Sequence, residues 1–310
     1  MMNAGRLDRI GPTQKSVCAI AVTYFPDEGF AQRIRIAKDQ VAALVVVDNS
    51  CDSSVALQLE AIRGSGVHLI FNEGNAGLAA ALNSGLAWAR AAGFRWAWLL
   101  DQDTTVHRDA VEQLLSIVQD YPDRESIAAI GSNYEPSASK QTPWSEVASV
   151  ITSGTLLSIP AFDRVGPFRD EFFVDCVDLD YCLRARADGF RILRSSSKLM
   201  EHQIGNVTMH SILSFRAGTS NHAMIRRYYL ARNLTTLMRE YWRLEPRWVA
   251  RMIFNQVKSM VLMFLFEKDR RLKLKLFLIG LFDGLRGWFG RDLSEWKNGN
   301  ANSNSARCAM

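Results

Sequence analysis

Four short apolar runs alternate with helical patterns over the first hundred residues, and this alternation constrains the fold more than any other feature. The runs are almost wholly apolar rather than apolar at every second position, and they cover residues 17–22, 41–47, 67–71 and 94–100. Helical patterns separate them at about residues 27–39, 53–63 and 76–91. Runs of this kind are typical of a parallel sheet that helices cover on both faces. We therefore expect an α/β fold.

A polar residue follows each of the four runs, and these residues are Thr23, Asp48, Asn72 and Asp101. Ligands of open parallel sheets bind outside the carboxyl ends of the strands. The four ends together therefore predict a ligand site, although a polar residue at any one strand end is common.

Asp101-Gln102-Asp103 places two carboxylates in a turn after the fourth run. Residues i and i+2 of an extended or turn backbone can point to one side, and two hard oxygen ligands suit Mg²⁺ or Mn²⁺ on a diphosphate. The metal would stabilise the charge that develops on a leaving nucleoside diphosphate. The alternative is a solvated acidic turn in which Asp103 or Thr104 caps the next helix. The place of the triplet after an apolar strand favours the metal.

Two further segments suit a nucleoside. Asp48 can accept the N3–H of a pyrimidine base, and its alternative role is a turn or helix cap. The segment 72–77 reads Asn-Glu-Gly-Asn-Ala-Gly, in which glycine permits close approach of the backbone to a ligand. It lacks the first glycine of G-x-G-x-x-G and follows the third strand, so a dehydrogenase is disfavoured. The alternative is a tight turn that starts a helix.

Asp175, Asp178 and Asp180 form an acidic cluster in the second half of the chain. One carboxylate can deprotonate an acceptor hydroxyl, and neighbouring charges can tune that base. Asp178 stands where a helix should begin, so it can also be an N-cap. His202 is a candidate metal or diphosphate ligand, although a lone histidine is more often structural.

Arg226 or Arg227, together with Arg232, opens a predicted helix and can hold phosphate oxygens bidentately. A solvated basic face over packed aromatic side chains explains the same residues equally well.

The net charge of +5 is unevenly placed. Residues 239–291 hold twelve Lys or Arg against five Asp or Glu, which gives +7 there and −2 elsewhere. Basic residues beside apolar, Trp-rich helix faces suit an interfacial membrane segment. Residues 248–266 approach spanning length, but Arg251, Asn255 and Lys258 interrupt them and favour an amphipathic helix over a transmembrane one. The alternative is a helical pair that closes the core.

The remaining features set boundaries. Five cysteines without a CxxC pair indicate reduced thiols, and the polar N-terminus has no apolar core of a secretory signal. A cytoplasmic protein at the inner face of the cell membrane is expected. We expect a flexible N-terminus at 1–15, a catalytic domain at 16–240, amphipathic helices at 241–294 and a disordered tail at 295–310.

The ordered set of segments resembles the family 2 glycosyltransferases, in particular rhamnosyltransferase-like members, over roughly residues 17–233. The resemblance rests on residues 22–26, 47–50, 72–77, 101–103, 153–154, 177–180, 201–202 and 226–233.

The resemblance implies a GT-A fold, in which a mostly parallel sheet is flanked by helices, and an inverting, divalent-metal-dependent transfer from a nucleotide-sugar. It implies nucleotide-binding roles for Thr23, Tyr24, Asp48, Asn72, Asn75, Gly77 and Asp101. It also places Asp103, with His202, on the metal and Asp178 at the catalytic base. The acidic residue that often precedes that base is Val177 here, which leaves Asp175 as the alternative base.

Members similar to this chain use dTDP-L-rhamnose and extend a lipid-linked glycan such as O-antigen at the cytoplasmic membrane face. A galactofuranosyl or other hexosyl transferase with a UDP-sugar is the alternative within enzymes. Nucleotidyl transfer is disfavoured because residues 23–27 are not a glycine-rich basic loop. A non-enzymatic membrane adaptor would leave the acidic sites unexplained, and nothing in the sequence indicates a nucleic-acid partner.

Overall fold

The computed structural model describes residues 12–63, 66–134, 142–201, 208–212, 215–219, 224–266, 269–291 and 293. The chain divides into two compact units, Met1–Asp170 with Val177–His202 and Glu171–Cys176 with Gln203–Met310. The expected boundary near residue 240 differs from this division, because helix α7 (Met224–Tyr241) packs along α9 (Arg270–Arg286) in the second unit. Residues 1–11 of the expected flexible N-terminus and all of the expected tail lie outside the described residues.

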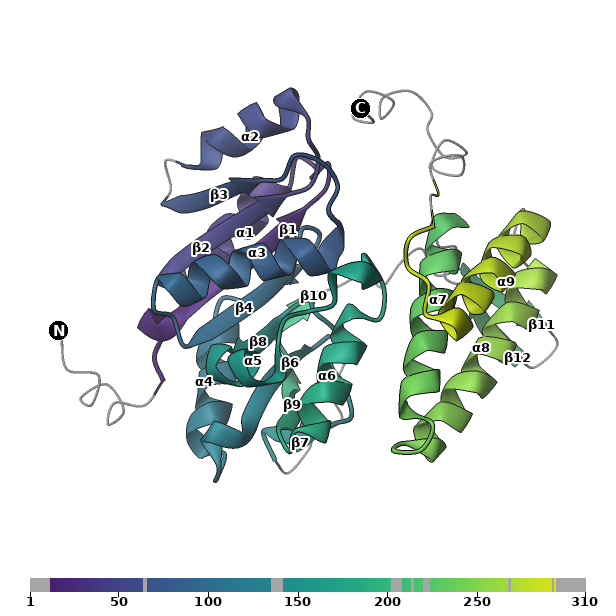
Figure 1. Cartoon of the computed structure of the whole chain (residues 1–310). Helices are drawn as coiled ribbons and strands as arrows, with labels where there is room; N and C mark the ends of the chain where they lie inside the picture. The colour runs from purple at the N-terminus through teal and green to yellow at the C-terminus, as the bar shows by residue number, and fades with distance from the viewer. Residues whose placement is uncertain are drawn as a thin grey trace. The chain divides into compact units, whose positions relative to one another are not determined.

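The first unit is built on an eight-stranded sheet of order β3-β2-β1-β4-β8-β6-β9-β7 (Figure 1). Its first four strands run parallel, as the sequence predicts, and they are β1 (Val17–Thr23), β2 (Ala43–Asp48), β3 (Val67–Phe71) and β4 (Trp96–Asp101). Thr23 pairs in register with Asp48, and Val22 with Asp101. The polar strand ends therefore meet at one edge of the sheet.

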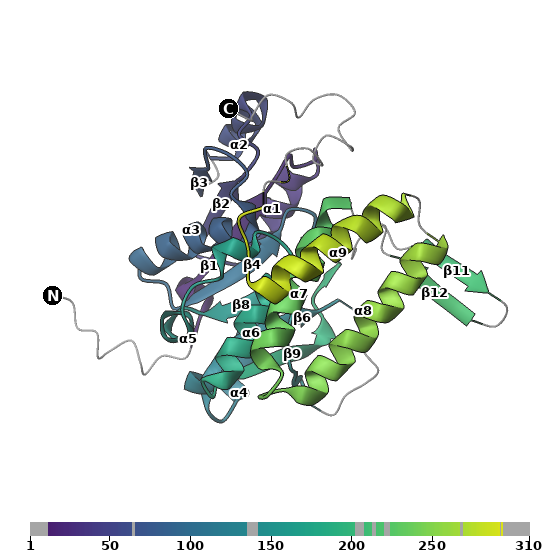
Figure 2. The same cartoon turned by 45° about the vertical axis from the view of Figure 1, so that its right-hand side comes forward.

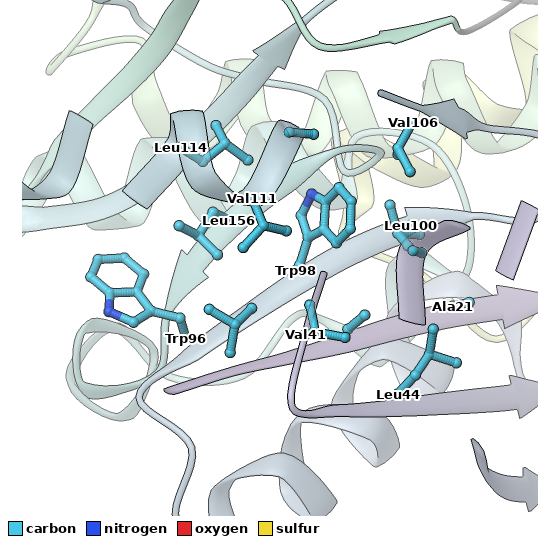
Figure 3. Packing of buried hydrophobic residues seen from close by; sticks show 14 of the residues in the cluster. Ala21, Val41, Leu44, Trp96, Trp98, Leu100, Val106, Val111, Leu114 and Leu156 are labelled. Atoms are coloured by element: carbon cyan, nitrogen blue, oxygen red, sulfur yellow. The ribbon is translucent and has the colours of Figure 1, made fainter. Parts of the chain in front are cut away.

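Helices cover both faces of this parallel half. They are α1 (Phe30–Lys38), α2 (Ser53–Arg63), α3 (Gly77–Ala91) and α4 (Ala110–Asp120). Ala21 and Trp98 face the same core as α1 and α4, and Figure 3 shows the Trp98 indole beside Val111 and Leu114 of α4. On the opposite face α3 lies close to the strands, since a Cβ at Gly85 would come within 2.5 Å of Ile20. Alternate strand residues thus supply the two apolar layers.

The other half of the sheet is mixed. It contains β6 (Ile127–Asn133), β7 (Trp144–Glu146), β8 (Thr155–Ser158) and β9 (Arg191–Lys198), with helices α5 (Ile159–Val165) and α6 (Val177–Ala187). β8 runs antiparallel to both β4 and β6. β8 ends at Ser158, because Ser158 caps α5 and Pro160 occupies the first turn of that helix, where a missing N–H costs nothing. β5 (Thr105–Val106) and β10 (Met200–Glu201) form a separate short pair, and 3₁₀ turns cover Gln14–Ser16, Arg124–Ser126 and Asp170–Phe172.

The second unit contains α7, α8 (Pro246–Phe266), α9 and a hairpin of β11 (Thr208–Ile212) and β12 (Phe215–Thr219) (Figure 2). Two glycines let α9 approach the α7 backbone. A Cβ at Gly280 would lie 2.3 Å from the Tyr228 carbonyl oxygen, and one at Gly284 would lie 2.4 Å from that of Arg232. Asp283 is fully buried between them and accepts hydrogen bonds from the Tyr228 hydroxyl at 2.9 Å and from the Arg291 guanidinium at 2.5 and 2.7 Å.

Helix α8 differs from every other long helix of the described residues in how little of it is covered. Only Val249 and Met263 of its 21 residues are buried. Four exposed or half-exposed apolar residues recur at helical spacing along one face, Ile253, Val257, Val261 and Phe264. By length and composition α8 is the one helix of the described residues that could cross a membrane.

Candidate active site

Asp48 joins the ends of β1 and β2 by hydrogen bonds. One of its carboxylate oxygens accepts the Thr23 hydroxyl at 2.8 Å and the Ser50 hydroxyl at 2.7 Å, and the other accepts the Ser50 N–H at 3.2 Å. Thr23, Asp48 and Ser50 are all buried. Three accepted bonds leave the carboxylate about one further acceptor position, so the contact expected for a pyrimidine remains chemically available.

Gln102, a residue for which the sequence pattern indicates no role, holds the segment that follows β1. Its side-chain oxygen accepts the Tyr24 N–H at 2.7 Å, and its side-chain nitrogen donates to the Tyr24 carbonyl at 3.2 Å. Arg33 of α1 donates to the Gln102 backbone carbonyl at 2.8 Å and is paired with Asp27. The middle residue of the Asp-x-Asp triplet thus fixes the backbone of Tyr24, one of the expected nucleoside neighbours.

Asn49 links the ends of β2 and β3 to the start of α3. Its side chain accepts a hydrogen bond from the Asn72 amide at 2.7 Å and donates to the Gly77 carbonyl at 3.1 Å. Asn75 accepts the Gly77 N–H at 3.0 Å, and Gly77 has a positive φ of 86° that favours glycine. The expected nucleotide-binding residues 72, 75 and 77 are therefore brought together around a buried amide that the sequence analysis did not identify.

Asp101 and Asp103 lie at the carboxyl edge, where the chain turns after β4. Ser153 lies beside them: its hydroxyl accepts the Asp101 N–H at 3.4 Å and hydrogen-bonds the Thr104 hydroxyl. The Asp103 side chain is exposed and Asp101 is half-buried.

The structure permits a metal here but supplies no closed cage. Among the described residues, no three His, Cys, Asp or Glu side chains gather to hold an ion, and His202 lies outside those residues. Mg²⁺ is commonly held by one or two carboxylates together with phosphate oxygens of the substrate. An exposed carboxylate at Asp103 fits a metal of that kind, which binds with the donor.

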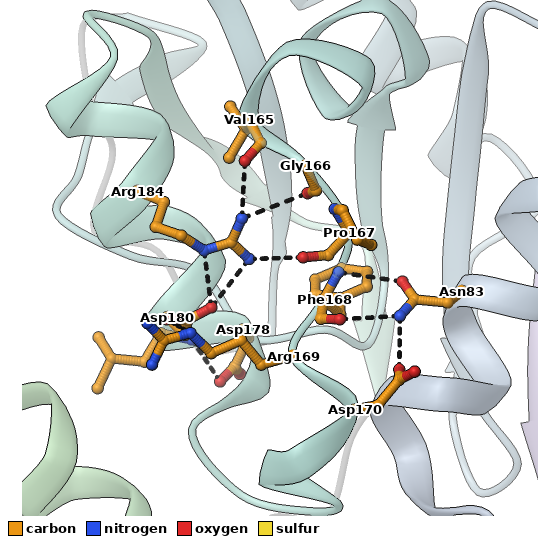
Figure 4. A network of polar contacts seen from close by, with 11 residues as sticks. Asn83, Val165, Gly166, Pro167, Phe168, Arg169, Asp170, Asp178, Asp180 and Arg184 are labelled. Carbon is orange, nitrogen blue, oxygen red and sulfur yellow. Dashed lines mark hydrogen bonds and ion pairs between the residues drawn. The ribbon is translucent and has the colours of Figure 1, made fainter. Parts of the chain in front are cut away.

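Asp178 occupies the first turn of α6, where its carboxylate accepts the Leu179 N–H at 2.7 Å. Two turns further on, α6 is fastened by Arg184, as Figure 4 shows. Arg184 pairs with the buried Asp180 at 2.9 Å and donates to backbone carbonyls of Val165, Gly166 and Pro167. Asp180 also faces Arg169 at 3.4 Å. Asp180 therefore holds α6 in place, and of the three clustered carboxylates Asp178 is the half-buried one on this helix.

Asp175 belongs to the second unit and is held by Arg226. The two side chains form a bidentate pair, with N···O distances of 3.2 and 2.5 Å. Both carboxylate oxygens of Asp175 thus accept a hydrogen bond from the Arg226 guanidinium. The pair ties Asp175 to α7 and engages Arg226, one of the two expected diphosphate ligands.

Arg232, the other expected diphosphate ligand, is 2% exposed. Its guanidinium donates to the backbone carbonyls of Glu171 and Phe172 at 2.7 and 3.2 Å. Burial lowers the pKa of this guanidinium from its ordinary value. The structure thus gives Arg232 internal partners within the second unit, and Arg227 is also buried, with a bond of 3.4 Å to Ser259.

Comparisons with known proteins agree with this geometry. Residues 20–167 match the model of glycosyl transferase family 2. The chain is 27% identical over 298 residues to a dTDP-rhamnosyl transferase, RfbF, of Shigella flexneri, covering 89% of this chain and 97% of that protein. It is 28% identical over 220 residues to a polyprenol monophosphomannose synthase of Mycolicibacterium smegmatis, covering 63% of this chain and 81% of that protein.

A solved structure of GalNAc-T7 with UDP, GalNAc and Mn²⁺ is similar in fold, with a TM-score of 0.54 and 11% identity over 88% of this chain and 58% of that one. These findings confirm the predicted GT-A-like fold and the rhamnosyltransferase-like resemblance. The chain is a glycosyltransferase that resembles glycosyl transferase family 2 over residues 20–167.

Proposed function

We propose that this glycosyltransferase moves L-rhamnose from dTDP-L-rhamnose to a lipid-linked saccharide during synthesis of a cell-surface polysaccharide such as O-antigen. The observation that carries the donor is the similarity to a dTDP-rhamnosyl transferase over 89% of the chain, which includes both compact units. The carboxyl edge of the sheet supplies the matching chemistry, since Thr23, Asp48 and Asn72 offer hydroxyl, carboxylate and amide groups to a nucleoside.

Asp178 is the proposed base of an inverting transfer. Its carboxylate accepts the proton of the acceptor hydroxyl, and the oxygen attacks the anomeric carbon from the face opposite the diphosphate. The bond between that carbon and the phosphate oxygen breaks, and dTDP leaves with the electron pair. Asp101 would lie near the ribose, and Asp103, with His202, would hold the Mg²⁺ or Mn²⁺ that neutralises charge on the diphosphate. The Mn²⁺ in the GalNAc-T7 structure supports a divalent ion without choosing between the two.

A donor panel tests the sugar, and substitutions test the base. Purified protein with Mg²⁺ or Mn²⁺ is given dTDP-rhamnose, UDP-galactofuranose and other UDP-hexoses with extracted lipid acceptors, and products are identified by mass spectrometry.

Asp178→Asn should lower kcat by at least about 100-fold while still binding dTDP, because general base catalysis contributes about 10²–10⁴-fold. Asp175→Asn tests the alternative base and should lower kcat less than Asp178→Asn does. Full transfer by a folded Asp178→Asn variant would exclude Asp178 as the base.

Transfer from a UDP-hexose alone would instead support the galactofuranosyl or other hexosyl alternative. The site residues would keep their proposed roles in that case, because the same strand ends would meet a different base and sugar.

Helix α8 supports a membrane-held acceptor. Its exposed apolar face adjoins a basic one, since Arg247, Arg251 and Lys258 recur at intervals of four and seven residues. A hollow of about 240 Å³ between α8 and α9 is lined only by apolar side chains, Met260, Val261, Phe264, Leu265 and Leu274. An apolar stripe beside a basic one suits a helix that lies in the interface of an anionic leaflet. The printed name of the polyprenol-linked relative is consistent with a lipid acceptor at the cytoplasmic face.

A further inference from the structure

The loop Glu171–Cys176 has a backbone that its sequence alone would not adopt. Phe173, Asp175 and Cys176 have φ angles of 62°, 62° and 61°, which is the left-handed region that side-chain-bearing residues rarely occupy. Such conformations persist only where surrounding contacts over-determine them, and they gather at functional sites. Val177 and Asp178 follow this loop directly in the chain.

Asn233 of α7 supplies contacts of that kind. Its side-chain nitrogen donates to the carbonyls of Phe172, Val174 and Asp175 at 2.9, 2.8 and 2.8 Å. The side chain is completely buried, so no water can take over these bonds. An amide has only two N–H groups, so three carbonyls must turn toward one point to share them, and that convergence defines the loop conformation.

Arg232 orients the side-chain amide of Asn233. Its Nε donates to the side-chain oxygen of Asn233 at 2.9 Å, which determines which end of the Asn233 amide faces the loop. The guanidinium carbon lies 5.4, 5.0 and 4.8 Å from the ring centres of Tyr228, Tyr229 and Phe289. A planar cation among three aromatic rings is held in one orientation.

We propose that Arg232 and Asn233 are positioning residues, which hold the loop Glu171–Cys176 in its left-handed form and thereby set the approach of Asp178 to the acceptor hydroxyl. The inference rests on the proposed function for the identity of the base. It replaces the diphosphate role expected for Arg232 with one that acts through the backbone. A misplacement of a catalytic group by about 1 Å can lower a rate about 100-fold without loss of substrate binding. Loss of the contacts from Arg232 and Asn233 is therefore expected to lower kcat.

The test uses the full chain with Asn233→Ala. We expect kcat to fall about 10- to 100-fold while the Kd for dTDP stays within about twofold. In hydrogen-exchange mass spectrometry, the peptide covering residues 171–178 should exchange faster, because its carbonyls lose their shared donor. Tyr228→Phe is the matched control. Tyr228 lies on α7 with Asn233, and the change removes its bond to buried Asp283 of α9 but keeps the ring over Arg232, so it should leave kcat within about threefold.

A second change separates positioning from general damage. Cys176→Gly places a residue that tolerates positive φ in the loop, so in the Asn233→Ala background it should recover at least about threefold of the lost kcat. If Asn233→Ala does not fold, Arg232→Lys serves in its place, since it keeps the charge but loses the fork that orients the amide.

Three results would overturn the inference: unchanged kcat in a folded variant, a matching loss of dTDP binding, or an equal loss of kcat in Tyr228→Phe. The exchange measurement needs no sugar transfer. If the wild-type protein does not transfer rhamnose, the proposed function is wrong. If the loop nevertheless exchanges faster in Asn233→Ala, the contacts inferred here still stand.

Discussion

Gln102 has a structural role and lies between two residues with proposed chemical roles. Its amide hydrogen-bonds both backbone polar groups of Tyr24, whereas Asp101 and Asp103 are the residues proposed to meet ribose and metal. Sequence reasoning finds carboxylates because few structural roles need two of them at a strand end. It overlooks a glutamine, because an amide becomes informative only when its partner 78 residues away is known.

Replacing Gln102 should weaken nucleotide binding more than it weakens the fold. We expect Gln102→Ala to raise the Kd for dTDP about 3- to 10-fold, because two hydrogen bonds that fix Tyr24 contribute about 0.5–1.5 kcal/mol each. Water can reach this exposed segment, so the loss of stability should stay within about 1 kcal/mol. Isothermal titration with dTDP measures the affinity.

Gln119→Ala is the control, since Gln119 makes one exposed contact to the Pro12 carbonyl at 3.1 Å. An affinity in Gln102→Ala equal to that of the control would show that the Tyr24 backbone needs no such support.

At the scale of elements, the parallel strands were predictable and the second half of the sheet was not. The strands expected at 17–22, 41–47, 67–71 and 94–100 are found within two residues at each end, because unbroken apolar runs between helices have one common outcome. β8 is only four residues long, and the pattern of so short a run in a sequence cannot be told from the start of a helix. The left-handed loop was unpredictable because its stabilising amide lies 58 residues later in the chain.

Helix α9 depends on glycine at two positions that face α7. In most helices Gly→Ala raises stability by about 1 kcal/mol. At Gly280 we expect the opposite, a loss of about 1–3 kcal/mol, because a Cβ would lie 2.3 Å from the Tyr228 carbonyl and force the helices apart. Equilibrium unfolding in urea measures the difference.

Gly74→Ala is the matched control, because a Cβ there meets nothing within 4 Å. Stabilisation of the Gly280→Ala variant would contradict the close packing of α7 and α9.

At the scale of the molecule, the second unit combines a buried polar interior with an uncovered apolar helix. Burial, together with the hydrogen bond to Asp283, raises the pKa of Tyr228 to about 12. Hydrogen bonds from Arg291 and Tyr228 lower the pKa of Asp283 even though burial acts in the other direction. These polar groups have hydrogen-bond partners within the unit, whereas the other described residues leave the apolar face of α8 exposed.

Charged substitutions on α8 should release the protein from membranes. We expect Val257→Glu with Val261→Glu to lower binding to anionic vesicles at least about 10-fold, since burial of each valine contributes roughly 1.5–3 kcal/mol. Binding of the wild-type protein should also weaken with added salt, because its basic face is screened. Vesicle co-sedimentation measures both effects.

Leu57→Glu is the control, because Leu57 is an exposed leucine, 73% accessible, on α2 of the first unit. Truncation after Trp242 would be a poorer test, since it removes α9 from α7. Wild-type levels of vesicle binding by the double variant would exclude α8 as the contact surface.

The dependence of the loop Glu171–Cys176 on Asn233 also sets an order of events during synthesis. The asparagine leaves the ribosome 58 residues after Asp175, which at about 5–20 residues per second is a delay of roughly 3–12 s. During that interval the parallel sheet has been completed, while the segment that leads to Asp178 lacks the hydrogen-bond donor that Asn233 supplies. The nascent chain therefore completes the strand ends proposed for the nucleotide first, and the loop before the proposed base last, when α7 has emerged.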